Sequence, residues 1–338
     1  MTHDVVVRAP LAGEGHTIAS LWRELWDIHE GWGGYPGSPL SETYEALALR
    51  LDDDARLRRG QPLLGRHIHI VAAMGDRVIG QVEGWFERFG NDETTPFTCE
   101  VRSLIVTESA RGSGAGKQLL ERLAGIAADL AKGTPFVLAA EVLAPNPALA
   151  FYSKVGYRPV SYTQRIVTSD ALVPKDSPLN ARLALPGDAF AIAVLESTLA
   201  QRRRHMGDLR FDRPRALDAT LVGAIAVHLG RAQEDQSELV VTDEAGSVRG
   251  GASLSVSHLD PPFLPARRAA LARIALDPSL SQEPAMAALV YAAAKHASRR
   301  GAATIEITDL PPPTAPLYDA VLRAGATPWS TIVLKSFT

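Results

Sequence analysis

The sequence predicts a mixed α/β (α+β) protein with two tandem domains, each a mostly antiparallel central sheet flanked by helices. Segments with the two-residue period of strands alternate with segments of helical period, as in mixed α/β folds. The chain has 338 residues, more than the roughly 150 of a common domain. Its element order recurs after a polar, proline-containing stretch. We therefore expect domains at residues 1–168 and 180–338, joined by a linker at 169–179.

The first domain is expected to begin with a strand and then a helix, in which Ile18, Leu21 and Leu25 recur at helical spacing. Gly75-Asp76 lies between two strand candidates and predicts a hairpin turn. Gly133 follows a long periodic segment and predicts the end of its helix. The expected strands are residues 5–11, 67–74, 77–88, 97–106, 136–142 and 157–168, and the expected helices are 14–29, 41–59, 114–132 and 147–154.

The second domain repeats this order of elements. Its repeat length is far above the 20–50 residues of solenoid units, so the pattern indicates a duplicated domain. The expected strands are residues 181–185, 238–242, 247–258, 267–276, 303–308 and 331–336, and the expected helices are 188–203, 215–232, 283–299 and 315–324.

Composition and charge narrow the functional classes. The formal net charge is −3, so no overall basic field would attract nucleic acid. The single cysteine, Cys99, excludes an intrachain disulfide and a multi-cysteine zinc site, and we expect no metal. The sequence shows neither a secretion signal nor an apolar run long enough to span a membrane. We expect a cytoplasmic protein with no nucleic-acid or membrane partner, either a monomer or a homodimer.

The strongest functional signal is the segment LIVTESARGSGAGKQLLERL, which starts at Leu104. A strand leads into a loop that contains Gly112, Gly114 and Gly116, and an amphipathic helix follows. Glycines let the backbone approach a ligand closely, and the free amides at a helix start attract anions. Positive charge is added by Arg111 and Lys117. The segment predicts a pyrophosphate site, although it lacks the GxxxxGK[ST] pattern of a P-loop.

At these residues the sequence resembles the GNAT superfamily of acetyl-CoA-dependent N-acetyltransferases, whose phosphate loop reads [Q/R]-x-x-G-x-[G/A]. Arg111, Gly114 and Gly116 match that pattern. Further along, NPALAFYSKVGY matches the family's later element, with Asn146 as a helix cap and Tyr152 inside the helix. The resemblance covers residues 1–168 by motif and 180–338 by element order alone, which is similar to the tandem GNAT arrangement.

The resemblance implies acetyl-CoA as cosubstrate. Tyr152 would protonate the departing CoA thiolate, for which a phenol is suited because it is protonated at neutral pH. Asn146 would contact the cofactor arm, and the backbone of Leu104 and Val106 would pair with that arm as with an extra strand. The implied cofactor-binding residues are Leu104, Ile105, Val106, Arg111, Gly112, Ser113, Gly114, Ala115, Gly116, Lys117 and Asn146.

Direct transfer to an amine also needs a group that removes a proton from the incoming ammonium. Strand alternation places Glu100 on the polar face of its strand, together with Leu104 and Val106. Some GNAT members carry a catalytic Glu at the corresponding position, so Glu100 is the first candidate for the base. Pairing of Glu100 with Arg102 at the surface is an equal alternative. The remaining candidates for the base are Glu141 and then Glu83.

The acceptor pocket is harder to predict. Trp32 and Tyr35 lie in a glycine-rich stretch that borders the acceptor cleft in GNAT folds, so we expect them to bind substrate together with Glu141. In the second domain the corresponding loop lacks glycine, and Glu283 stands where a carboxylate would repel a pyrophosphate. We expect that domain to be a degenerate copy that completes the acceptor pocket.

Three other features have simpler explanations. Cys99 is expected on an apolar, buried strand face rather than as a nucleophile. His67 and His69 share a strand face without a third ligand at metal-site spacing, so we expect a half-exposed strand. The run Arg202-Arg203-Arg204-His205 ends a helix, where cations suit the dipole. It predicts a solvated terminus, with binding of an anionic substrate group as the alternative.

The sequence therefore predicts an acetyl-CoA-dependent N-acetyltransferase that transfers an acetyl group directly to the primary amine of a small molecule. A longer acyl-CoA is an alternative donor. A protein or peptide N-acetyltransferase fits the same motifs, and so does a catalytically silent acyl-CoA-binding sensor.

Overall fold

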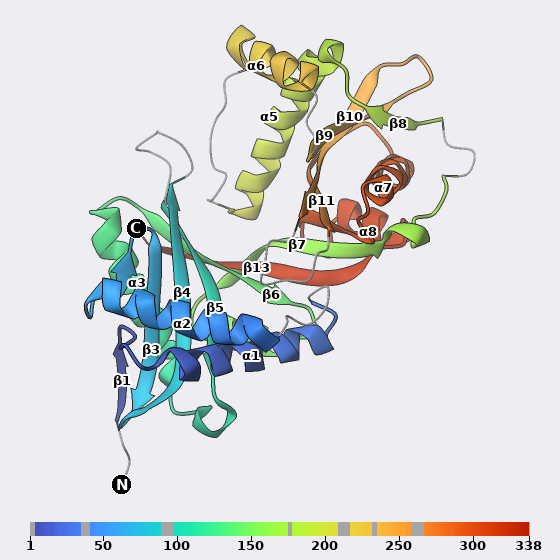
Figure 1. Cartoon of the computed structure of the whole chain (residues 1–338). Helices are drawn as coiled ribbons and strands as arrows, with labels where there is room; N and C mark the ends of the chain where they lie inside the picture. The colour runs from blue at the N-terminus through green and yellow to red at the C-terminus, as the bar shows by residue number, and fades with distance from the viewer. Residues whose placement is uncertain are drawn as a thin grey trace.

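The computed structural model describes residues 4–34, 41–88, 97–174, 178–208, 217–231, 235–258 and 267–337, and its mixed α/β architecture confirms the predicted fold class (Figure 1). The first half contains β1 (Val5–Arg8), α1 (Gly15–Gly31), α2 (Ser41–Arg58), β2 (Leu63–Leu64), β3 (His67–Met74), β4 (Arg77–Arg88), β5 (Phe97–Val106), α3 (Ala115–Ala131), β6 (Phe136–Leu143), α4 (Ala148–Lys154) and β7 (Arg158–Val167). The second half contains β8 (Asn180–Leu183), α5 (Ala189–Met206), α6 (Ala219–Gly230), β9 (Gln236–Thr242), β10 (Val248–His258), β11 (Arg267–Leu276), α7 (Gln282–Arg299), β12 (Thr304–Leu310), α8 (Pro316–Arg323) and β13 (Thr327–Phe337).

A single sheet runs through both halves. Its strand order is β1-β3-β4-β5-β6-β13-β7-β12-β11-β10-β9-β8, with β2 paired to β3 beside this path. All neighbours along the path are antiparallel except β5 with β6 and β11 with β12. The order reads as two equivalent sets of strands arranged about the β13–β7 pair.

The two halves exchange their last strands. β13, from the end of the chain, lies between β6 and β7, and β7 lies between β13 and β12. Figure 1 shows β6, β7 and β13 crossing the middle of the molecule between the blue–cyan part and the orange part. Each half of the sequence therefore completes the sheet of the other, and the pairing crosses the expected boundary at residues 169–179.

Helices cover both faces of the sheet. In the first half, α3 and α4 pack on one face in a core that contains Leu119, Leu123 and Tyr152. On the other face, Ile18 of α1 and Leu51 of α2 pack against strands β3, β4 and β5. We call these the α3 face and the α1 face. In the second half, α7 and α8 form the larger core, while α5 packs on the opposite face.

A β-bulge interrupts β5 and, at the equivalent position, β11. Ser103 and Arg273 adopt φ angles of 51° and 55°, and the register with the neighbouring strand shifts at each of them. The bulge corrects one expectation. It reverses the alternation, so that Leu104 and Val106 pack on the α3 face with Cys99, whereas Glu100 lies on the opposite face.

Candidate functional site

The glycine-rich loop forms a concave backbone at the start of α3. Gly112 and Gly114 both have φ angles of 86°, a left-handed conformation that favours glycine. Ser113 lies between them, and its hydroxyl accepts a hydrogen bond from the Ala115 amide at 3.3 Å. Successive residues of this kind turn several amide groups toward one point, which is a known way of building an anion site.

Several of these amides have no partner within the part of the chain that the structure describes. They belong to Gly112, Gly114, Gly116 and Lys117. A Cβ atom at Gly116 would meet the Phe151 ring at 3.3 Å, so the helix start lies close to α4. With the positive end of the α3 dipole beneath them, the free amides fit a pyrophosphate group.

Next to this loop, β5 separates from its parallel neighbour β6. The two strands pair from Phe97 with Phe136 to Val101 with Ala140. Beyond Val101, β5 stays paired with β4, while β6 pairs with β13 as far as Leu143. The edge of Leu104, Ile105 and Val106 that faces away from β4 is therefore unpaired, and an extended ligand can pair with it.

The α4 segment closes the α3 face of this gap. The side chain of Asn146 accepts a hydrogen bond from the Ala148 amide at 2.9 Å and so caps the helix, as the sequence predicts. Tyr152 is buried, with its ring 5.1 Å from that of Tyr157. Burial raises the pKa of the Tyr152 hydroxyl, which keeps it protonated.

Comparison with known proteins identifies this part of the chain. Residues 20–157 match the family described as Acetyltransferase (GNAT) family.

The first half contains a GNAT domain.

Solved structures agree with this at the level of the fold. A GCN5-related N-acetyltransferase from Sphaerobacter thermophilus is 18% identical, with 98% of this chain and 95% of that chain covered, at a TM-score of 0.56. A fungal glucosamine N-acetyltransferase region within a multi-domain GH3 β-N-acetylglucosaminidase is 15% identical; the alignment covers 100% of this chain and 38% of that chain, at a TM-score of 0.54. No curated protein sequence matches the chain.

On the α1 face of the GNAT domain, the three candidate bases lie on adjacent strands. Glu83 is opposite Arg102 in the β4–β5 register, and Glu100 follows on the same face of β5. Glu141, on β6, also points away from the α3 face, and its carboxylate accepts a hydrogen bond from Ser330 of β13 at 2.6 Å. Glu100 is half exposed and pairs with Arg102 at 2.6 Å, which is the surface pairing that the sequence left as an alternative.

A buried hydrogen-bond network surrounds Glu83. The His67 ring lies 2.9 Å from the Glu83 carboxylate and 2.8 Å from the Arg58 guanidinium. Burial alone would raise the pKa of Glu83, but the hydrogen bond from His67, the neighbouring imidazoles and the Ser103 hydroxyl hold that pKa at about 2. The expectation of a half-exposed strand at His67 and His69 was wrong, because His69 is fully buried and bonds Gln81 at 3.0 Å.

The low pKa of Glu83 makes stability depend on pH. Because the folded-state pKa is below the ordinary value of 4.5, the carboxylate stabilises the fold above that pH. A shift of this size corresponds to about 3 kcal/mol, lost as the pH falls from 4.5 toward 2. We expect Glu83→Gln to lower the urea-unfolding free energy at pH 7, with the gap from wild type shrinking at pH 3. Glu87→Gln, on the same strand but exposed, is the control. A gap that stays constant with pH would contradict this.

In the second half, a side chain of α5 bonds to the part of β11 that is equivalent to the unpaired edge of β5. Arg202 of α5 donates to the Ile274 carbonyl at 2.7 Å, and Ile274 is equivalent to Leu104. Arg203 pairs with Asp309 at 2.6 Å. These two arginines are mostly buried, and burial lowers the pKa of Arg202 to about 10. The expected solvated terminus was therefore wrong at Arg202 and Arg203.

The loop before α7 is also closed by its own side chains. Asp277 accepts hydrogen bonds from the amide and hydroxyl of Ser279 at 2.9 and 2.7 Å. Glu283, in the first turn of α7, pairs with Arg323 at 2.8 Å. A carboxylate in the first turn of α7 would repel an anion at this helix start. The degenerate copy stays a prediction.

The remaining predicted residues lie at the end of α1, on β5 and at the start of α3. Trp32 follows the last turn of α1, with its ring 5.5 Å from that of His29, while Tyr35 lies outside the described residues. Cys99 is buried, as expected, and burial raises the pKa of its thiol to about 12. Lys117 and Arg111 are exposed beside the loop, near Glu121 at 3.6 Å and Glu24 at 3.9 Å respectively.

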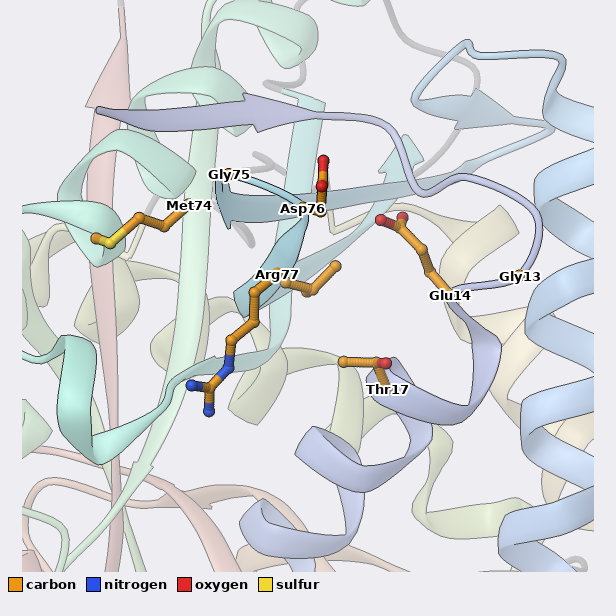
Figure 2. Close-up of a pocket in the computed structure, with 8 residues that line it drawn as sticks. Gly13, Glu14, Thr17, Met74, Gly75, Asp76 and Arg77 are labelled. Carbon is orange, nitrogen blue, oxygen red and sulfur yellow. The ribbon is translucent and has the colours of Figure 1, made fainter. Parts of the chain in front are cut away.

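A cavity of about 640 Å³ lies elsewhere, between the start of α1 and the β3–β4 turn. Figure 2 shows Glu14 and Thr17 of the α1 region near Asp76 and Arg77 of the hairpin. None of the residues predicted for the site lines it, and Glu14 pairs with Arg8. We therefore do not place the reaction there.

The described residues contain no group of three or more His, Cys, Asp or Glu side chains placed to hold a metal ion. In the same ranges, no helix combines the length and the apolar character needed to cross a membrane.

Proposed function

We propose that the chain is an acetyl-CoA-dependent N-acetyltransferase that transfers the acetyl group directly to the primary amine of a small molecule. The observation that carries the proposal is the juxtaposition, in one half only, of the loop of free amides and the unpaired edge of β5. The loop suits a pyrophosphate, and the edge suits the extended arm that follows it in CoA.

The chain's own residues would hold the cosubstrate in order along this path. The amides of Gly112, Gly114, Gly116 and Lys117 would bind the phosphates, and Arg111 would add positive charge. The backbone from Val106 back to Leu104 would pair with the arm, so its thioester end would reach the bulge at Ser103. Acetyl-CoA supplies an activated acetyl thioester there. Asn146 borders the same gap at the start of α4.

Tyr152 is proposed to protonate the departing thiolate. We expect Tyr152→Phe to lower kcat by about 10²–10⁴-fold, the range for loss of a general acid, with little change in acetyl-CoA affinity. Tyr157→Phe is the matched control, because the buried Tyr157 hydroxyl has no hydrogen-bond partner among the described residues and its removal should be tolerated. Initial rates and calorimetric titrations of both variants would test this. Equal rates in the two variants would remove Tyr152 from the mechanism.

Contacts from the exchanged strands favour a small acceptor. Arg165 of β7 donates to the Gly33 carbonyl at 2.6 Å, which ties the end of α1 to the middle of the sheet. A Cβ at Gly34 would meet the Leu143 side chain at 2.9 Å, so the end of α1 also packs on β6. These contacts tie the end of α1 to β6 and β7, and we propose that they narrow this face so that it takes a small amine in preference to a polypeptide.

The test is release of the CoA thiol, with product mass, from acetyl-CoA and a panel of small primary amines. The panel includes propylamine, benzylamine, 2-phenylethylamine and glucosamine, with lysine-containing peptides run in parallel. We expect acetylation of small amines. Acetylation of peptides alone would identify a peptide acetyltransferase, and acetyl-CoA binding without transfer to any amine would identify a sensor.

A further inference from the structure

We infer that a cavity between α7 and β8 binds a small organic anion, one that carries a carboxylate or phosphate group on an apolar body. The cavity has a volume of about 440 Å³ and lies in the second half, where β8 ends the strand order of the sheet and packs beside α7 (Figure 1). We call it the α7–β8 cavity. None of the residues predicted for the acetyl-CoA site lines it, so the two sites are separate.

The walls of the α7–β8 cavity are mostly apolar. One wall is a single face of α7, to which helical spacing brings Ala288, Ala292 and the ring of Tyr291. The opposite wall belongs to β8, β9 and the segment that leads into β8, with the apolar members Val173, Pro174, Leu179, Leu183 and Leu239. Small-molecule sites are commonly hollows of about 300–1,000 Å³ with apolar walls and a few polar groups. The cavity has the size and the lining of such a site.

The charged groups that line the cavity are all basic. They are Arg182, Lys295, His296 and Arg299, and no Asp or Glu among the described residues lines it. Arg182 already pairs with the Asp188 carboxylate, at 2.7 and 3.0 Å. Lys295 and Arg299 lie one turn apart on α7, are exposed, and form no ion pair within the ranges that the structure describes. In a chain of net charge −3, this cavity therefore carries positive charge that no carboxylate balances.

His296 lies within the same positive field. Its ring Nε2 is 3.1 Å from the Ser237 hydroxyl of β9, which holds the imidazole in position. Burial, together with the positive charges of Arg300 and Arg299, lowers the pKa of His296. The two arginines make a further positive charge unfavourable here, and for the same reason they make an anion favourable.

The combination of walls and charges sets the class of the ligand. Lysine and arginine bind carboxylates and phosphates alike, through charge-assisted hydrogen bonds. An inorganic anion would leave the apolar walls in contact with water, and a neutral apolar molecule would leave Lys295 and Arg299 without a partner. An anion with an aromatic or branched apolar body satisfies both parts of the cavity, and its body can pack on the Tyr291 ring.

The experiment titrates the chain by calorimetry with two anions, 4-phenylbutyrate and phenyl phosphate, and with the neutral 4-phenylbutanamide. We expect at least one anion to bind, with an affinity that falls as salt is added, because salt screens exposed charges. The amide should bind at least about 10-fold more weakly than the carboxylate of the same shape, or not at all where phosphate is preferred. Whichever anion binds more tightly identifies the preferred acidic group. Failure of both anions to bind, or an amide as tight as the anions, would overturn the inference.

Variants locate the bound anion. Lys295→Gln and Arg299→Gln each remove one cation and are expected to weaken binding by about 10-fold, while Ala292→Phe fills the cavity and is expected to abolish binding. Arg122→Gln removes the same charge from an exposed position on α3 and is the matched control. Thermal unfolding of each variant confirms that it is folded. Wild-type affinity in both Lys295→Gln and Arg299→Gln would overturn the assignment to this cavity.

The loop at the start of α3 is the competing site, because its free amides also suit an anion. The titrations are therefore repeated with Gly114→Glu, in which that loop carries a carboxylate. We expect the anion to bind Gly114→Glu as it binds wild type, and loss of binding there would assign the anion to the loop and overturn the α7–β8 site. Failure of acetyl transfer to every amine and peptide would overturn the proposed function and leave these titrations unaffected.

Discussion

Truncation after Ala326, which removes β13, is expected to unfold the first half of the chain together with the second. β13 pairs with β6 from Ser330 to Phe337 and with β7 from Thr327 to Leu334. Its Val333 side chain is buried in the core of the first half. Loss of a central strand exposes two long edges and exceeds the roughly 5–15 kcal/mol that holds a domain folded. Circular dichroism and acetyl-CoA titration of the truncated chain would show neither a cooperative transition nor binding.

A point substitution tests the same dependence without truncation. Val333→Asp buries a charge and is expected to destabilise the chain by roughly 4 kcal/mol or more, with Ser336→Asp, exposed on the same strand, within about 0.5 kcal/mol of wild type. Thermal unfolding of wild type should show one transition for both halves. A truncated chain that still bound acetyl-CoA would contradict the shared sheet.

Gly114→Glu is expected to abolish acetyl-CoA binding. The left-handed backbone of Gly114 disfavours a side chain, and the new carboxylate would lie beside the free amides that are proposed to hold the phosphates. Repulsion between like charges a few ångströms apart is worth a few kcal/mol at a protein surface, so the affinity should fall by at least about 100-fold. In calorimetry, wild type should bind one acetyl-CoA per chain and the variant none.

Gly133→Glu is the control for backbone strain. Gly133 also has a positive φ, of 81°, but it follows the C-terminal end of α3, away from the loop. Normal binding in Gly133→Glu with loss in Gly114→Glu would locate the cosubstrate at the start of α3. Two sites per chain would contradict the degenerate second half, and equal affinities in the two variants would contradict the loop assignment.

The local structure of this protein is predictable from its sequence. Helices and most strands form close to the expected residues, because hydrophobic periodicity and glycine positions such as Gly133 act within a few residues. The phosphate loop and the helix cap at Asn146 are local in the same sense. The matched family and the α/β class follow from these short patterns.

The non-local features were not predictable. Nothing in the periodicity of β13 shows that it pairs with β6 rather than only within its own half. The bulge at Ser103 has no glycine to signal it, so simple alternation misplaced Leu104 and Val106. The burial of Arg202 depends on a carbonyl that is far away in sequence. The hydrogen bond from Trp22 of α1 to Ser103 of β5 joins two elements far apart in sequence, and only their packing brings it together.

The exchange of β7 and β13 also changes what the segment between the halves does. In a protein with two independent domains, such a segment is a hinge, and a protease that cuts it releases two particles. Here each fragment would retain a strand embedded in the sheet of the other, so a single nick between Ser169 and Leu179 would leave one particle of unchanged hydrodynamic radius. The covalent connection sets the stoichiometry of the halves at one to one, while hydrogen bonds across the sheet keep them together.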